Sequence, residues 1–318
     1  MLDWRTALIM RIAAWQGRTF RPDVTVAAMR LGYREMNRRL GLRPRAGVAT
    51  RDLTIGEGDG ALRARLYRPE GDTRVLPLLV YFHGGGFVIG DIDAYDNLTR
   101  FFAAEGALAV LAVEYRLGPE HRFPHAHEDG FAALAFAQRD AGALGIDARA
   151  IAVGGDSAGG AIAATLSAFA ESRGLARPAA QLLIYPSVDG TARFPSRQRF
   201  TAANLPLTPA TIGWFARHYF SAAEDASDPR MVPLDAPHPE RVPPTYLLAA
   251  GHDPLVDEGR AYAQRLRDAG VRVVYDLRPR LAHGFVNMAG AVPPAARAMR
   301  DAVRTVAAWL RDEREAAA

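Results

Sequence analysis

The sequence predicts an α/β fold in which a mostly parallel β-sheet is flanked by helices, and three observations support it. Residues 76–82 form a continuous apolar run, which is typical of a strand buried in a parallel sheet. Before this run, residues 51–55 and 62–68 are strand-like and are joined by a glycine-rich segment, which predicts an antiparallel hairpin. After it, predicted strands and helices alternate to the end of the chain. An opening hairpin followed by repeated β–α units is typical of a doubly wound sheet.

The first 45 residues precede every predicted strand and consist of two predicted amphipathic helices. In the first, within residues 1–16, large apolar side chains recur at helical spacing: Trp4, Leu8, Ile12 and Trp15. In the second, we expect Asp23 to be the N-cap and Gly41 to end the helix. Such a layer either simply packs on the main domain or helps to cover a pocket.

The remainder of the 318-residue chain suits one large α/β domain. Strands are predicted at 108–115, 150–154, 181–185, 245–250 and 271–277, and helices at 128–140, 161–172, 208–219, 256–268 and 294–312. Residues 187–220 form a long insertion before the next strand, and prolines interrupt it at three positions. The sequence contains no internal repeat or low-complexity linker.

Composition argues against several classes of protein. The pI of about 9.6 and the formal charge of +4 suggest a nucleic-acid partner, but all 39 basic residues are arginines scattered among 35 acidic ones, so we expect none. The absence of cysteine excludes disulfides and thiolate metal sites and is compatible with a reducing compartment. No stretch reaches the length of a membrane span, and Arg5 and Arg11 interrupt the apolar N-terminus, which makes a poor signal peptide. We therefore expect a cytoplasmic protein.

The motif GDSAG at residues 155–159 lies where a predicted strand meets a predicted helix. A serine between two glycines in that context is typical of a nucleophile elbow. The turn holds Ser157 in a strained conformation, and side chains two residues to either side would collide, which explains the glycines. The N–H of Ala158, at the start of the helix, would then point towards developing negative charge. The motif also arises by chance, so its partners decide the interpretation.

A second glycine-rich motif, HGGGF at residues 83–87, follows the strand at 76–82 directly. We interpret Gly84, Gly85 and Gly86 as the loop of an oxyanion hole, whose N–H groups act with that of Ala158 on a carbonyl oxygen that becomes negative. A flexible hinge and a phosphate loop are the alternatives. A phosphate loop would need Lys-Ser/Thr after the glycines or a G-x-G-x-x-G frame, and neither is present.

A serine nucleophile needs a histidine base. In this sheet architecture the order along the chain is serine, acid, histidine, which leaves four histidines after Ser157: His218, His238, His252 and His283. His283 follows the last predicted strand and precedes the last long helix, so its side chain can reach the carboxyl edge of the sheet. We therefore assign the base to His283.

Three acidic residues follow the strand at 245–250. Asp253 lies at the transition from strand to loop, where it suits the role of fixing the imidazole tautomer and stabilising the imidazolium. Asp257 and Glu258 begin the next helix, where they favour its positive end, and at least one of them is expected to point to solvent. Asp253 is therefore our candidate for the acid.

The motifs HGGGF, GDSAGG, DPLVDEG and AHGF, in this order, resemble those of the hormone-sensitive-lipase-like (bacterial family IV) esterases. The resemblance covers about residues 50–310. It implies an α/β-hydrolase fold and hydrolysis of carboxylic esters through Ser157, Asp253 and His283, without a cofactor or a metal. It also implies a cap built from residues 1–45 and an insertion at about 187–220, on a catalytic domain of residues 46–318.

Between the first two motifs, residues 115–121 also resemble the family, with two mild departures. Gly118 stands where the family usually has alanine, and Arg122 where it often has proline, and neither is a catalytic group. Within this segment we expect Arg116 and Glu120 to form a structural ion pair that supports the floor of the site.

The motifs together predict a carboxylesterase that hydrolyses small, uncharged, short- to medium-chain esters through an acyl-enzyme. An amidase or peptidase on the same fold is one alternative, although the chain lacks a large extension for selecting peptides. A non-catalytic receptor for small ligands is another, and the presence of His283 argues against it. The resemblance further suggests a homodimer that pairs near Val271–Leu277, since an edge strand needs a partner or cover.

Overall fold

The computed structural model describes residues 1–16, 21–202 and 205–316. In this part of the chain, eight strands form one sheet in the order β1-β2-β4-β3-β5-β6-β7-β8. Their bounds are β1 Val48–Ile55, β2 Leu62–Pro69, β3 Leu76–Phe82, β4 Ala109–Val113, β5 Ile146–Asp156, β6 Ala180–Ile184, β7 Thr245–His252 and β8 Val273–Ala282. Strand β2 is antiparallel to β1 and to β4, and the other neighbouring pairs are parallel. The predicted opening hairpin and mostly parallel sheet are confirmed.

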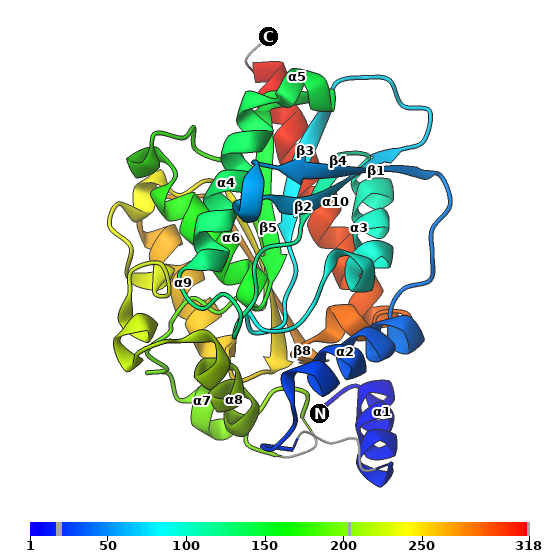
Figure 1. Ribbon diagram of the computed structural model, residues 1–318, viewed down its shortest axis with the longest axis vertical. Coiled ribbons are helices and arrows are strands. Elements are labelled where there is room, and N and C mark those ends of the chain that lie inside the picture. The colour runs from blue at the N-terminus through cyan, green and yellow to red at the C-terminus, as the bar shows by residue number, and fades with distance from the viewer. Residues whose placement is uncertain (17–20, 203–204, 317–318) are drawn as a thin grey trace.

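Long helices cover both faces of the sheet (Figure 1). Helices α3 (Ile92–Gly106) and α10 (Pro293–Ala316) pack on one face, and α4 (His125–Arg139), α6 (Ala158–Phe169) and α9 (Val256–Asp268) pack on the other. The apolar side chains of β3 alternate between these two layers: Leu78 and Val80 face one, and Leu79 and Tyr81 face the other. This two-sided burial explains why the sequence of β3 is apolar throughout.

The remaining helices lie mainly at the carboxyl ends of the parallel strands, in the lower part of Figure 1. They are α1 Trp4–Trp15, α2 Val26–Leu40, α7 Ser196–Arg199 and α8 Pro209–Tyr219, while the short α5 Ala141–Leu144 precedes β5. Short 3₁₀ helices occur at Gly58–Gly60, Glu171–Arg173, Ala223–Ser227, Pro233–Asp235, Pro239–Arg241 and Phe285–Met288. The N-terminal segment and the insertion meet where the Trp214 indole N–H donates to the Val24 carbonyl oxygen, at 3.2 Å.

Two features of the helices differ from the sequence prediction. Helix α3 was not predicted, although Asp91 caps it by accepting the Ala94 N–H and its apolar residues lie on one buried face. The N-cap of α2 is Thr25 rather than Asp23, because the Thr25 hydroxyl accepts the Ala28 N–H whereas Asp23 pairs with Arg21. Gly41 does end α2, as expected.

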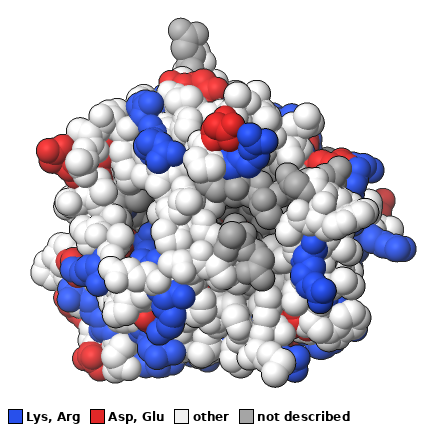
Figure 2. Space-filling view, turned by 90° about the horizontal axis from the view of Figure 1, so that it is seen from below, with Lys and Arg blue, Asp and Glu red and all other residues white. Residues whose placement is uncertain are grey.

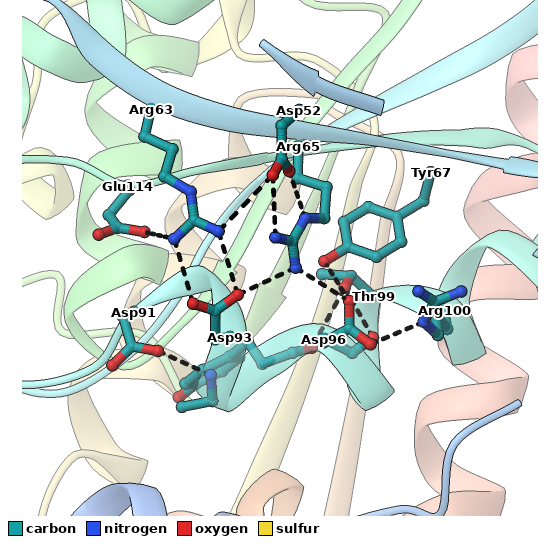
Figure 3. Close-up of polar contacts among 12 residues, drawn as sticks. Asp52, Arg63, Arg65, Tyr67, Asp91, Asp93, Asp96, Thr99, Arg100 and Glu114 are labelled. Atoms are coloured by element: carbon teal, nitrogen blue, oxygen red, sulfur yellow. Dashed lines mark hydrogen bonds and ion pairs between the residues drawn. The ribbon is translucent and has the colours of Figure 1, made fainter. Parts of the chain in front are cut away.

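An arginine-rich network ties the hairpin strand β2 to helix α3 (Figure 3). Every second residue of a strand points to the same face, so Arg63, Arg65 and Tyr67 lie on one face of β2 and reach towards the helix. The Arg65 guanidinium bonds to Asp52 at 2.5 Å, Asp93 at 3.0 Å and Asp96 at 3.3 Å, and its side chain is only 16% exposed. Arg63, 39% exposed, pairs with Asp93 at 3.1 Å. The network therefore has a partly buried centre and a solvated edge.

This difference in burial predicts unequal effects of removing the two arginines. Arg65→Met leaves three carboxylates without their shared, partly buried cation, and we expect the free energy of unfolding to fall by about 1–3 kcal/mol. Arg63→Met removes a more exposed, salt-screened pair and should cost less than about 1 kcal/mol. Urea unfolding of the two variants checks the order. An Arg63→Met variant that is the less stable of the two would contradict it.

Candidate active site

Ser157 lies in the sharp turn between β5 and α6, in the strand–turn–helix context that the motif predicts. Its backbone has φ 54° and ψ −117°, a left-handed conformation that is strained for a residue with a side chain. A Cβ atom at Gly155 would overlap backbone atoms of Gly159 and Phe82, and one at Gly159 would overlap the Phe82 carbonyl. Only glycine fits at both positions, because the turn packs directly against the end of β3.

His283 and Asp253 reach Ser157 from the ends of two neighbouring strands. His283 directly follows β8, and its Nε2 lies 3.0 Å from the Ser157 Oγ, while its Nδ1 lies 2.8 Å from an Asp253 carboxylate oxygen. Asp253 directly follows β7, is fully buried, and also accepts the Leu255 N–H at 2.8 Å. An ionised carboxylate only accepts hydrogen bonds, so Nδ1 carries the proton and Nε2 accepts the serine hydroxyl.

The other histidines that follow Ser157 in the chain have different partners. His218 on α8 bonds to the Trp214 carbonyl oxygen, and the exposed His238 pairs with Glu240. His252 is the last residue of β7 and precedes the acid. Of the four candidates weighed from the sequence, the structure therefore brings His283 to the serine.

The two acidic residues that begin α9 have a different environment from the one expected. Glu258 is fully buried and accepts the Val188 N–H at 3.1 Å and the Arg197 Nε–H at 2.9 Å. Asp257 accepts the Ser196 N–H at 3.0 Å. Glu258 does not point to solvent, because the insertion folds over the start of α9 and supplies its partners. Asp257 is partly exposed, as expected of at least one of the two, and also pairs with the exposed Arg199. Burial raises the pKa of Glu258 to about 7, against the opposing effect of Arg197.

The glycine loop after β3 lies beside the serine, but its three N–H groups are not equivalent. The Gly84 N–H donates to Asp156 at 2.9 Å and also lies 3.2 Å from the Tyr95 hydroxyl, so it is occupied. Within the described residues, the N–H groups of Gly85, Gly86 and Ala158 make no hydrogen bond. The expectation that Gly84 donates to an oxyanion therefore needs correction, because its N–H is used to hold the loop in place.

Gly85 and Gly86 are required by both conformation and space. Their φ angles are 122° and 59°, which favour glycine. A Cβ at Gly86 would overlap the ring of Phe215 on α8, so the loop also touches the insertion. His83 supports the loop from behind: burial lowers the pKa of His83 to about 4, and its neutral Nδ1–H donates to the Gly84 carbonyl oxygen at 2.7 Å.

Asp156, which has no role predicted from the sequence, lies at the centre of a buried polar cluster. Its carboxylate accepts hydrogen bonds from the Gly84 N–H at 2.9 Å, the Tyr81 hydroxyl at 2.9 Å and the Tyr95 hydroxyl at 3.1 Å. The Tyr95 hydroxyl in turn lies 2.6 Å from that of Tyr33 on α2. Burial raises the pKa of Asp156 to about 6 in spite of these donors. Of these tyrosines only Tyr81 belongs to a strand, near the end of β3, whereas Tyr95 and Tyr33 lie on helices α3 and α2.

The expected ion pair between Arg116 and Glu120 does not form. The Arg116 guanidinium bonds to the buried Asp129 on α4, at 2.5 Å for the shortest contact. Glu120 instead pairs with Arg30 on α2 at 2.7 Å, and Arg30 also donates to the carbonyl oxygens of Val88 and Gly118. The pair was predicted because the two residues are close in sequence. In the fold, Arg116 bonds to helix α4 and Glu120 bonds to helix α2.

A cavity of about 1440 Å³ opens in front of Ser157 and His283. Helices α1, α2 and α8 line it with mostly apolar side chains, among them Met10, Met29 and Phe215. Seen from below in Figure 2, the molecule presents a largely uncharged face with a hollow. In residues 1–16, 21–202 and 205–316, no group of three or more His, Cys, Asp or Glu residues is arranged to hold a metal ion. No helix in those ranges is long and apolar enough to cross a bilayer.

The burial of Asp156 predicts a pH-dependent contribution to stability. Its pKa of about 6 in the folded protein lies above the ordinary value of 3.8, so the folded state holds the proton more tightly than the unfolded state. The resulting stabilisation is complete below about pH 4 and is lost as the pH rises through about 6. Asp156→Asn cannot titrate. We therefore expect the stability advantage of the native protein over this variant to shrink by roughly 2–3 kcal/mol between about pH 4 and pH 7.

Urea unfolding of both proteins across this pH range measures the difference directly. All other titrating groups are common to the two proteins, so their contributions cancel. A difference in unfolding free energy that is the same at every pH would contradict a proton-binding carboxyl at residue 156.

Comparisons with known proteins agree with this geometry. A family model described as alpha/beta hydrolase fold matches residues 79–287. The chain is 41% identical over 248 residues to an ethyl acetate hydrolase of Pseudomonas putida, covering 77% of this chain and 78% of the relative. It is 37% identical over 253 residues to a carboxylesterase of Mycobacterium tuberculosis, covering 78% of each. A solved ester-hydrolase from the metagenome of Lake Arreo matches with a TM-score of 0.92 and 36% identity, over 97% of this chain and 99% of that one.

The matched range contains the glycine loop, Ser157, Asp253 and His283. The fold and the family resemblance expected from the motifs are thus confirmed, and the chain belongs to the α/β-hydrolase family.

Proposed function

We propose that this protein is a carboxylesterase that hydrolyses short- to medium-chain esters through an acyl-enzyme on Ser157. The observation that carries the proposal is the chain of hydrogen bonds from the Ser157 hydroxyl to His283 at 3.0 Å and on to Asp253 at 2.8 Å. The relatives named ethyl acetate hydrolase and carboxylesterase support the same reaction.

In the proposed mechanism, the Ser157 Oγ attacks the acyl carbon while His283 Nε2 takes the hydroxyl proton. Asp253 holds the imidazole in the required tautomer and stabilises the imidazolium that forms. The carbonyl oxygen becomes negative and receives hydrogen bonds from the N–H groups of Gly85, Gly86 and Ala158. The imidazolium then protonates the leaving alcohol. Water, activated by His283, repeats the sequence on the acyl-enzyme and releases the carboxylic acid.

We further propose that residues 1–45 and the insertion at about 187–220 form a cap on the catalytic domain of residues 46–318. Three contacts support it. Trp214 on α8 donates to Val24, which joins the two parts of the cap to each other. The buried pair of Glu258 and Arg197 fixes the insertion to α9, with 2.8 Å between the charged groups. The pair of Arg30 and Glu120 fixes α2 to the catalytic domain.

The proposed preference for short acyl chains concerns the part of the cavity next to the serine. The whole cavity, about 1440 Å³, is larger than a short ester fills. Phe215 of α8 lines the cavity together with Ser157, and its ring lies against Gly86 of the loop beside the serine. We infer that this ring limits the length of acyl chain that fits there.

The exposed edge of β8 supports a homodimer as part of the proposal. β8 is the last strand of the sheet, and the side chain of Val274 on it is 36% exposed. The Arg280 carbonyl oxygen on β8 accepts the Asp3 N–H. As an edge strand, β8 can offer its other backbone groups to a second copy. Light scattering that finds only a 34.5 kDa species at micromolar concentration would count against this pairing.

Replacing the proposed nucleophile tests the function. Ser157→Ala should lower kcat for ester hydrolysis by roughly 10⁴-fold or more, because no acyl-enzyme can form. Circular dichroism establishes that the variant is folded. A folded Ser157→Ala protein that keeps most of its turnover would falsify the proposal.

The acids at positions 253 and 257 provide a matched pair of variants. Asp253→Asn should lower kcat by up to about 10⁴-fold, because tautomer control and the charge opposite the imidazolium are lost. Asp257→Asn changes an acid that contacts the insertion rather than His283, and it should cost about tenfold or less. If Asp257→Asn were the more damaging of the two, the assignment of the acid would be wrong.

A homologous series of p-nitrophenyl esters tests the acyl preference. We expect kcat/KM to peak between about four and eight acyl carbons and to fall beyond, because longer chains meet the ring of Phe215. Phe215→Ala should shift the maximum towards longer chains. A maximum at about sixteen carbons in the native protein would overturn the preference without affecting the mechanism.

A further inference from the structure

Helix α1 leaves a continuous apolar stripe on the outside of the molecule. Trp4 is 59% exposed, Leu8 47%, Ile12 45% and Trp15 87%, and their spacing places them along one side of the helix. Of the eight large apolar side chains that are exposed in the described residues, six belong to residues 1–31. We call the stripe of Trp4, Leu8, Ile12 and Trp15 the N-terminal apolar face.

The exposure of this face does not come from a detached helix, because the other side of α1 is anchored. Ile9 and Met10 pack against the core on the α10 side of the sheet, and Thr6 is buried. The Asp3 N–H donates to the Arg280 carbonyl oxygen at 2.8 Å, and the Asp3 side chain caps the helix. The structure therefore holds the apolar stripe outward.

The charge of the N-terminal segment differs from that of the rest of the chain. Residues 1–45 contain 10 of the 39 arginines and 3 of the 35 acidic residues, a net charge of +7, whereas residues 46–318 carry −3. Each of the three acidic residues already has a partner within this segment. Asp3 caps α1, Asp23 pairs with Arg21, and Glu35 pairs with two arginines of its own helix.

Some arginines of this segment form ion pairs with acidic residues, but within the described ranges the two arginines on α1 do not. Arg30, Arg34 and Arg45 pair with acids of the main domain. In the described part of the chain, Arg5 and Arg11 on α1 form no ion pair with an acid, and Arg5 lies over the Trp4 ring at 4.4 Å. The apolar stripe is thus accompanied by positive charge that has no acidic partner.

The N-terminal apolar face borders the cavity that contains the serine. Ile12 of this face also lines the cavity, and so does the exposed Leu31 of α2. Figure 2 shows the hollow within a largely uncharged face, with arginines towards its edge. An apolar molecule held against this face would therefore lie at the opening of the cavity.

We propose that the N-terminal apolar face docks on an anionic lipid–water interface, with the cavity open towards the lipid. Tryptophan and aliphatic side chains favour the boundary between headgroups and acyl chains, and arginines favour anionic headgroups. A second copy of this chain is a poorer occupant, because a two-fold interface would bring the same unpaired arginines together. Docking on lipid matches both the apolar stripe and its charge.

Vesicles of defined composition test the proposal without any turnover. The four tryptophans divide into Trp4 and Trp15, which are exposed, and Trp214 and Trp309, which are 1% and 4% exposed. A change of emission on adding vesicles therefore reports on α1. We expect a blue shift and co-sedimentation with phosphatidylcholine vesicles that contain about 30% phosphatidylglycerol. Binding should be much weaker to pure phosphatidylcholine or at high salt.

A triple variant and a matched control locate the docking site. Trp4→Ser, Leu8→Ser and Trp15→Ser together should lower partitioning onto the anionic vesicles at least tenfold. None of these residues lines the cavity, so kcat/KM on a water-soluble ester should stay within about twofold. Val75→Ser removes a 50% exposed apolar side chain elsewhere and should leave vesicle binding unchanged.

Three results would overturn the proposal. The first is that the native protein fails to bind the anionic vesicles. The second is that the triple variant binds them as well as the native protein does. The third is that sedimentation finds a dimer for the native protein and a monomer for the triple variant, because a second copy would then cover the face. Because binding is measured equally well with Ser157→Ala, failure of the proposed esterase function would leave this test intact.

Discussion

The buried carboxyl of Asp156 is the interaction on which the geometry of the site depends. It lies one residue before Ser157, at the end of β5, and it accepts hydrogen bonds from the end of β3, from the glycine loop and from α3. A buried carboxyl is costly unless several donors satisfy it, so each of these elements is held to it. The strained turn at Ser157 and the loop that contains Gly85 and Gly86 therefore keep a fixed relative position. Through Tyr95 and Tyr33 the same cluster reaches α2.

The start of α9 holds the other side of the site in a comparable way. Asp253 faces His283 from the end of β7, and within one helical turn Glu258 faces Arg197 of the insertion. One short segment thus positions both the proposed triad acid and the insertion beside it. A buried pair tolerates the loss of neither partner, which links the placement of the insertion to that of the acid.

The strands were predicted well because their patterns depend on local sequence. The continuous apolar run of β3 reflects burial on both faces of the strand. The mixed sequences of β1 and β2 reflect strands that are buried on one face. Helix α3 was missed, although a capping aspartate precedes it. The N-cap of α2 was misplaced by two residues, because two polar residues compete there and only the backbone geometry selects Thr25.

Within the site, residue type and chain order led from the sequence to Ser157, His283 and Asp253, which the folded chain brings together. Order along a parallel sheet is a topological constraint, and residues at successive strand ends meet at one edge. The partners of Arg116, Glu120 and Glu258 could not be inferred in this way. Each bonds to a helix or loop that is distant in the sequence, and nearest-neighbour reasoning paired Arg116 with Glu120.

The sequence by itself determined the fold class, the strained serine turn and the glycine loop, because each is encoded by a local pattern of residue types. Only the tertiary structure decided which glycine N–H remains free, which acids are buried, and which side of α1 faces outward. These properties depend on what packs against a residue across the fold. Hydrogen-bond satisfaction and burial are set by those distant neighbours, and a linear pattern does not contain them.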